Sequence, residues 1–319
     1  MMNKTQISCL PSGTANFKFQ TISITLFSFL MLFSCSSTEK KTNGKLQILT
    51  TTQIIADGVE QIVGDRASVV SLMGSGVDPH LYKAAQSDMR KMNDADIIIK
   101  NGLHLEGKMA DILHKYGRQK PVFEVSDGMD ASLFRKVGSN TEDPHLWFNV
   151  NMWKNGLTYI LAKIQEEDPA NAEFYSENWY SYEKQLDSLD ALVQSKINEI
   201  PEKQRVLITA HDAFGYFGIR YGMEVKGLQG LSTLANPGLK DIAELVDFII
   251  ERQIKAVFVE TSVSEKNINV LVKGCENRGH TISIGGFLYS DALGQSGTDE
   301  GTYIGAVMAN TNKIVNALK

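Results

Sequence analysis

The chain has 319 residues, of which 43% are hydrophobic and 22% are charged. These proportions are typical of a folded globular protein and exclude a disordered or collagen-like chain. The formal net charge is −5, from 32 basic and 37 acidic residues. Because nucleic-acid-binding proteins usually carry a basic excess, we expect no nucleic-acid partner.

The first 34 residues differ from the rest of the chain. Residues 1–34 contain two lysines, no acidic residue and an apolar run from Thr21 to Phe33. This run has about 13 residues, whereas a membrane-spanning helix needs roughly 20, so it predicts a cleaved signal peptide. Cys35 follows directly, as in bacterial lipoprotein signals, and we expect it to carry a lipid anchor with residues 35–45 as a flexible tether. Simple secretion with a free Cys35 is the alternative. Either way, we expect export to the extracytoplasmic side of a membrane, in the periplasm or at the cell surface.

Strand-like and helix-like segments alternate through the remaining residues. Such alternation predicts parallel βαβ units, and the chain length favours two domains. We therefore expect an α/β fold with two (β/α) lobes, each containing a four-stranded, mainly parallel sheet. The strand-like runs are Leu46–Thr51, Ser68–Met73, Asp96–Lys100 and Val122–Val125 in the first lobe, and Arg205–Ala210, Glu224–Gly227, Ala256–Glu260 and Thr281–Ile284 in the second.

A mostly helical segment separates the two sets of strands. Between Pro169 and Pro201, apolar residues recur at every third or fourth position, which is the helical period. These residues are Tyr175, Trp179, Tyr182, Leu186, Leu189, Val193 and Ile197. A long helix is rigid, whereas a flexible linker is rich in glycine and serine, so we expect the lobes to move little relative to each other. The predicted divisions are 46–150 for the N-terminal lobe, 151–201 for the helical linker and 202–319 for the C-terminal lobe.

Three of the six histidines occur in settings that indicate a shared site. His80 and His145 lie in near-identical motifs, and His211 directly follows a strand-like run. The motifs are Asp78-Pro-His-Leu-Tyr82 and Asp143-Pro-His-Leu-Trp147. Because proline fixes one backbone dihedral, each imidazole is expected to project from a stiff turn. A single histidine of this kind is more often a packed turn residue, but the repetition makes coincidence a weaker explanation.

All three histidines fall beyond the carboxyl ends of predicted parallel strands, the edge at which open α/β sheets bind ligands. Asp291 lies in the loop after the last strand-like run, so each lobe supplies two residues, and we expect their site in the cleft between the lobes. Three imidazole nitrogens and one carboxylate oxygen suit zinc and similar transition metals. Glu260, at the end of another strand, is either an acceptor for an imidazole N–H or an ordinary solvated or salt-bridged glutamate. His104, His114 and His280 have plainer structural explanations.

Seven short blocks carry a family resemblance. They are Gly76-Val-Asp-Pro-His80, Asn101-Gly-Leu-His-Leu-Glu-Gly107, Asp143-Pro-His-Leu-Trp147, Thr209-Ala-His-Asp-Ala-Phe-Gly215, Gly227-Leu-Gln-Gly-Leu-Ser232, Phe258-Val-Glu-Thr-Ser262 and Asp291-Ala-Leu-Gly294. In this order they resemble the metal-binding solute receptors of zinc and manganese ABC importers, the cluster A-I extracellular binding proteins. The resemblance implies two (β/α) lobes joined by a rigid helix. It also implies an ABC permease with its ATPase subunits as partners, and we expect a monomer. The family's four metal ligands carry over onto His80, His145, His211 and Asp291.

The resemblance also bears on the metal. Manganese-importing members often have glutamate where His211 stands, while members with three histidines bind zinc, manganese or both. Many zinc-directed members carry a histidine- and acid-rich loop, but residues 118–142 contain no histidine. Since extra imidazole suits zinc and carboxylate suits manganese, we expect Zn²⁺ first and Mn²⁺ next as the transported ligand.

Two other functions would use the same residues. A zinc hydrolase needs an open coordination position with a general base beside it, and the sequence contains no His-Glu-x-x-His motif and no obvious base. A surface adhesin would hold its metal as a structural ion and unfold on losing it. We expect neither of these functions. Instead, we expect a binding protein without enzymatic activity that captures a divalent metal and hands it to a membrane permease. No nucleotide-binding motif occurs, so ATP hydrolysis would belong to a partner.

Overall fold

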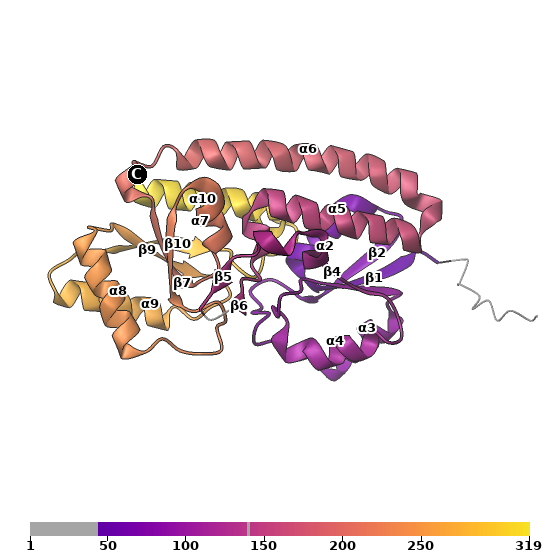
Figure 1. The fold of residues 1–319 in the computed structure, drawn as a ribbon, viewed down its shortest axis with the longest axis horizontal. Helices are drawn as coiled ribbons and strands as arrows, with labels where there is room; N and C mark the ends of the chain where they lie inside the picture. The colour runs from indigo at the N-terminus through magenta and orange to yellow at the C-terminus, as the bar shows by residue number, and fades with distance from the viewer. Residues whose placement is uncertain (1–43, 139–140) are drawn as a thin grey trace, which may run out of the picture. The chain divides into compact units, whose positions relative to one another are not determined.

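The computed structural model describes residues 44–138 and 141–319 (Figure 1). The predicted signal peptide, Cys35 and most of the predicted tether therefore lie outside the described residues. Lys45–Lys319 form one compact unit. None of the helices within these ranges is both long and apolar enough to cross a membrane.

The first half of this unit contains a four-stranded parallel sheet in the order β2-β1-β3-β4. Its central strands β1 and β3 are mostly buried, and β3 accordingly begins with three consecutive isoleucines instead of an alternating pattern. The strands are β1 (Leu46–Thr52), β2 (Ala67–Met73), β3 (Ile97–Lys100) and β4 (Val122–Glu124). Between them lie α2 (Gln53–Val63), α3 (Gln86–Asp94) and α4 (Ala110–Tyr116). The predicted parallel α/β organisation of this half is confirmed.

The second half contains four strands in two parallel pairs, β7 with β8 and β9 with β10. The strands are β7 (Val206–His211), β8 (Glu224–Gln229), β9 (Ala256–Glu260) and β10 (Ser283–Leu288), and the helices are α7 (Gly215–Tyr221), α8 (Leu239–Glu251), α9 (Lys266–Asn277) and α10 (Tyr303–Leu318). β7 and β9 are neighbours, but no ladder joins these two fully described strands. At the carboxyl ends of these two strands, the Glu260 side chain of β9 faces the backbone of β7. Its Oε1 accepts a hydrogen bond from the backbone N–H of His211 at 2.9 Å. The expected continuous sheet is therefore interrupted at its centre.

The helix α6 (Ala172–Ile197) follows α5 (Val150–Glu167) and, in Figure 1, lies along α5 and α10. Its 26 residues extend over about 39 Å. All seven apolar positions of the predicted helical stripe are buried, so the periodicity is confirmed. The helix begins later than Pro169 because Pro169–Asn171 forms a separate 3-10 turn.

One hydrophobic cluster joins the two halves. It includes Ile48 from β1, Trp153 from α5, Leu186 from α6, Phe258 from β9 and Ile314 from α10, all of them 0–2% exposed. Because these side chains pack together, the position of one half against the other is set by side-chain packing as well as by the connecting helices.

A short antiparallel hairpin precedes α5 and was missed by the sequence analysis. Its strands are β5 (Lys136–Val137) and β6 (Thr141–Glu142), and the backbone N–H of Asp143 donates to Arg135 O at 2.9 Å beside them. Two-residue strands are too short for hydrophobic alternation to reveal.

Asp57 on α2 places a buried carboxylate against the start of α10. Its Oδ2 accepts from the backbone N–H of Tyr303 at 3.0 Å. Burial raises the pKa of Asp57 from 3.8 to about 6, although this hydrogen bond lowers it. Between pH 3.8 and about 6 the folded protein therefore holds a proton that the unfolded chain has released. Consequently, the free energy of unfolding falls as the pH rises through this range.

Replacing Asp57 with asparagine removes this titration. A pKa displaced from 3.8 to about 6 corresponds to about 3 kcal/mol, so between pH 4 and pH 7 we expect Asp57→Asn to gain up to that amount over the wild type. Chemical denaturation of chelator-treated protein across this range measures the difference. Asp65→Asn, at a side chain that is 83% exposed, is the control and should show no such trend. A constant difference between Asp57→Asn and the wild type at every pH would contradict the interpretation.

Candidate metal centre

Four side chains from separate loops and strand ends converge in the interior. They are His80 after β2, His145 after the β5–β6 hairpin, His211 and Asp291 after β10. Their ligand atoms all lie within 4.8 Å of one another, and no residue of the four is more than 4% exposed. His211 is the last residue of β7 rather than the first residue beyond it. The structure thus brings together all four residues of the predicted metal site.

The spacing of these atoms is close to that of a tetrahedral metal centre. His145 Nε2 lies 3.3 Å from the Nε2 atoms of both His80 and His211. The Asp291 oxygens lie 3.3–3.7 Å from the three Nε2 atoms. In a tetrahedron with metal–ligand bonds of 2.0–2.1 Å, the ligand atoms are about 3.3–3.4 Å apart. Five of the six side-chain pairs approach this spacing, and all four ligand atoms lie within 4.8 Å of one another.

Two carboxylates determine how the rings are oriented. His145 Nδ1 lies 2.7 Å from Asp143 Oδ1. His211 Nδ1 lies 2.6 Å from Glu260 Oε2, an ionic contact whose angle is outside the hydrogen-bond range. Because each Nδ1 faces a carboxylate, the ring proton is favoured there and the Nε2 lone pair points to the centre.

Asp291 carries the negative charge of the site. Neither of its oxygens has a hydrogen-bond donor. Burial raises the pKa of Asp291, but the facing histidines lower it more, and the pKa lies well below its usual range. Burial also lowers the pKa of His80 to about 4, so this ring is neutral at pH 7. Burial lowers the pKa of His211, but Glu260 and Asp291 raise it well above its usual value, so a proton on this ring balances Asp291 until a metal ion replaces it.

The two Asp-Pro-His motifs hold their histidines in the same way. Asp78 Oδ1 accepts from the backbone N–H of His80 at 2.8 Å, and Asp143 Oδ1 accepts from that of His145 at 3.0 Å. Such turns are typical of aspartate two residues before the donor. The contact of Asp143 with the His145 ring was not predicted. The aspartate repeated before each histidine is the signal that could have revealed it.

The remaining histidines lie elsewhere. His114 Nε2 is 3.0 Å from Arg118 Nη2, and His280 Nε2 is 2.9 Å from Ile254 O. His104 borders a separate cavity beside α4. Within residues 44–138 and 141–319, the four converging residues form the one group of three or more histidine, cysteine or acidic side chains with metal-ligand spacing.

Comparison with known proteins agrees with this geometry. The family model "Zinc-uptake complex component A periplasmic" matches residues 48–317. The manganese-binding lipoprotein MntA of Bacillus subtilis is 49% identical over 297 residues, covering 92% of this chain and 97% of its own. The zinc-binding protein TroA of Treponema pallidum is 41% identical over 282 residues, covering 88% and 92%. A solved structure of the periplasmic zinc-binding protein TroA superimposes with a TM-score of 0.85 at 42% identity, covering 86% of this chain and 99% of that one.

These matches extend over nearly the whole of the described chain and confirm the resemblance seen in the sequence. The range matched by the family model covers both halves, the long helix between them and the positions of all four converging residues. The chain belongs to the cluster A-I family of metal-binding substrate-binding proteins of ABC importers.

Proposed function

We propose that this protein captures a divalent transition-metal ion on the extracytoplasmic side of a membrane and delivers it to an ABC permease driven by its ATPase. The proposed ligands are His80, His145, His211 and Asp291. The observation that carries the proposal is a buried, ionised Asp291 without a donor, facing three imidazole nitrogens at 3.3–3.7 Å. The proposed lobes, 46–150 and 202–319, each supply two ligands, and 151–201 connects them. We further propose that the protein acts as a monomer.

A binding role fits the site better than catalysis. Three nitrogens and one oxygen complete a tetrahedral set, which leaves no open position for an activated water. All four side chains are buried, so a substrate larger than an ion does not reach them without movement. We therefore propose that the protein performs no covalent chemistry and that neither a zinc hydrolase nor a metal-dependent adhesin describes its main role.

Zinc is the first candidate for the transported ion. Imidazole is a favourable ligand for zinc, and the separations near 3.3 Å between Nε2 atoms match a tetrahedral site. Manganese is the second candidate, supported by a specific observation. Both oxygens of Asp291 are free of donors and face the centre, so the carboxylate can offer two oxygen ligands, which suit manganese. Competition between the two ions at fixed pH, with metal analysis of protein from its own host, decides between them.

Removing one ligand tests the site directly. We expect His145→Ala and His211→Ala each to weaken zinc binding at least tenfold, because a buried nitrogen ligand is lost. Isothermal titration calorimetry measures the affinity, and His114→Ala is the control that should bind as the wild type does. Unchanged affinity in both ligand variants would refute the assignment. The wild type should also stay folded by circular dichroism when a chelator removes the metal, whereas a structural ion would leave an unfolded chain.

The carboxylates behind the rings provide a second test. Glu260→Gln and Asp143→Asn keep the side-chain shape but remove the charge that orients His211 and His145. We expect each to lower zinc affinity 10- to 100-fold in competition with a chromophoric chelator. Glu166→Gln changes an exposed residue paired with Lys163 and should have no effect. Equal affinities for all three variants would show that ring orientation does not depend on these contacts.

The proposed lipid anchor at Cys35 is tested separately from the metal site. We expect Cys35→Ser to abolish acylation, since the thiol is the acceptor, and to release the protein from the membrane fraction. Detergent phase partitioning of the wild type and the variant in a bacterial host measures this. Cys275→Ser, at the buried thiol of α9, should leave the partitioning unchanged. A Cys35→Ser protein that still partitions with the membrane would favour another mode of attachment.

A further inference from the structure

One arginine joins the two halves behind the proposed ligands. Arg135 Nη1 donates to Asp143 Oδ2 at 2.8 Å. Arg135 Nη2 donates to both oxygens of Asp212, at 2.8 and 3.1 Å. Arg135 and Asp143 flank the β5–β6 hairpin, whereas Asp212 follows β7 in the second half. A single planar guanidinium therefore binds one carboxylate from each half, a geometry that lysine does not provide.

Both carboxylates adjoin proposed metal ligands. The other oxygen of Asp143, Oδ1, lies 2.7 Å from His145 Nδ1, so the aspartate lies between the arginine and the ring. Asp212 is the residue directly after His211. Arg135 is therefore connected to His145 through Asp143 and to the backbone beside His211 through Asp212.

The surroundings are shaped to hold the guanidinium. A Cβ atom at Gly215, the first residue of α7, would lie 2.4–2.6 Å from Arg135 guanidinium atoms, so a larger residue there would displace the guanidinium. The Arg135 backbone N–H donates to the Tyr216 hydroxyl at 3.0 Å, and that hydroxyl donates to Asp143 O at 3.0 Å. The three charged side chains are only 0–23% exposed, which makes their contacts stronger than those of a surface ion pair.

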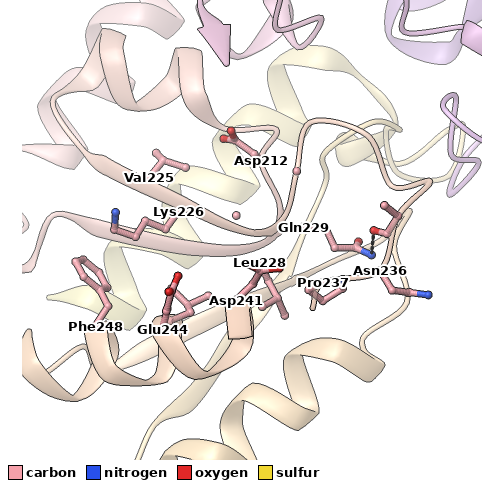
Figure 2. Close-up of a pocket in the computed structure, with 14 residues that line it drawn as sticks. Asp212, Val225, Lys226, Leu228, Gln229, Asn236, Pro237, Asp241, Glu244 and Phe248 are labelled. Atoms are coloured by element: carbon pink, nitrogen blue, oxygen red, sulfur yellow. Dashed lines mark hydrogen bonds between the residues drawn. The ribbon is translucent and has the colours of Figure 1, made fainter. Parts of the chain in front are cut away.

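We propose that Arg135 is a positioning residue that holds the two halves at the spacing the metal requires, and that its contact with Asp212 must break before the metal leaves. This inference rests on the proposed function, because it takes His145 and His211 as ligands. Without the guanidinium, Asp143 and Asp212 would be neighbouring like charges and would favour separation. Asp212 also borders a cavity of about 690 Å³ between β8 and α8 (Figure 2), so water can solvate this carboxylate once the contact breaks.

The rate of zinc release tests whether the contact between Arg135 and Asp212 must break before the metal leaves. Zinc-loaded protein is mixed with excess fluorescent chelator in a stopped-flow instrument, using the wild type, Arg135→Gln, Asp212→Asn and the double variant. We expect each single variant to release zinc at least tenfold faster than the wild type. The double variant should be no faster than Arg135→Gln, because both changes remove the same contact between the halves.

Two further variants separate positioning from general stability. Gly215→Ala keeps every charged group, but its methyl group displaces the guanidinium, and it should also accelerate release. Arg220→Gln is the matched control, since it removes another partly buried arginine–aspartate pair, in which Arg220 Nε donates to Asp190 Oδ1 at 3.0 Å between α7 and α6. Its release rate should equal that of the wild type, even if its free energy of unfolding falls.

The outcomes distinguish the inference from the proposed function. A wild type that binds neither zinc nor manganese contradicts the proposed function itself. A wild type that binds zinc, with Arg135→Gln and Gly215→Ala releasing it at the wild-type rate, overturns the inference alone. So does Asp212→Asn at the wild-type rate, because Arg135 would then act only through Asp143, and so does an equally fast Arg220→Gln. If Arg135→Gln does not fold, Asp212→Asn and Gly215→Ala still decide the question.

Discussion

The centre of this protein depends on one electrostatic constraint, a buried carboxylate that has no donor of its own. Asp291 is ionised, 1% exposed and faced by the Nε2 atoms of three imidazoles. Isolating such a charge from water costs several kcal/mol unless a positive charge faces it. A divalent cation at the centre satisfies the carboxylate and the lone pairs together.

The rest of the architecture keeps these four donors in place. Parallel strands end at a common edge in each half, so loops from distant parts of the sequence meet there. The Asp-Pro-His turns fix two rings locally, and Asp143 and Glu260 orient rings through Nδ1. The long helix α6 and a hydrophobic cluster shared by both halves then set the distance across the site. In this arrangement Arg135 provides a polar connection between the two ligand segments that its partners adjoin.

Features that depend on local periodicity were predictable from the sequence, whereas features that depend on pairing were not. The strands of the first half and the buried stripe of α6 follow from the spacing of apolar residues. The β5–β6 hairpin is too short to leave such a pattern. The interruption between β7 and β9 was missed because strand pairing depends on how two distant segments meet. At that interruption, the Glu260 side chain accepts a hydrogen bond from the backbone N–H of His211.

The features of the candidate site fall into the same two classes, local ones that the sequence predicts and ones that depend on tertiary structure. By itself, the sequence determined the residue types, the repeated Asp-Pro-His turns and the position of each candidate after a strand, because these are properties of short segments. Only the tertiary structure decided that Nε2 atoms lie 3.3 Å apart, that both Asp291 oxygens lack donors and that Arg135 crosses between the halves. Those facts are distances between residues far apart in the chain, and they are fixed by the packing of the strands of both halves against shared helices. Composition, charge and motif spacing carry no information about such distances.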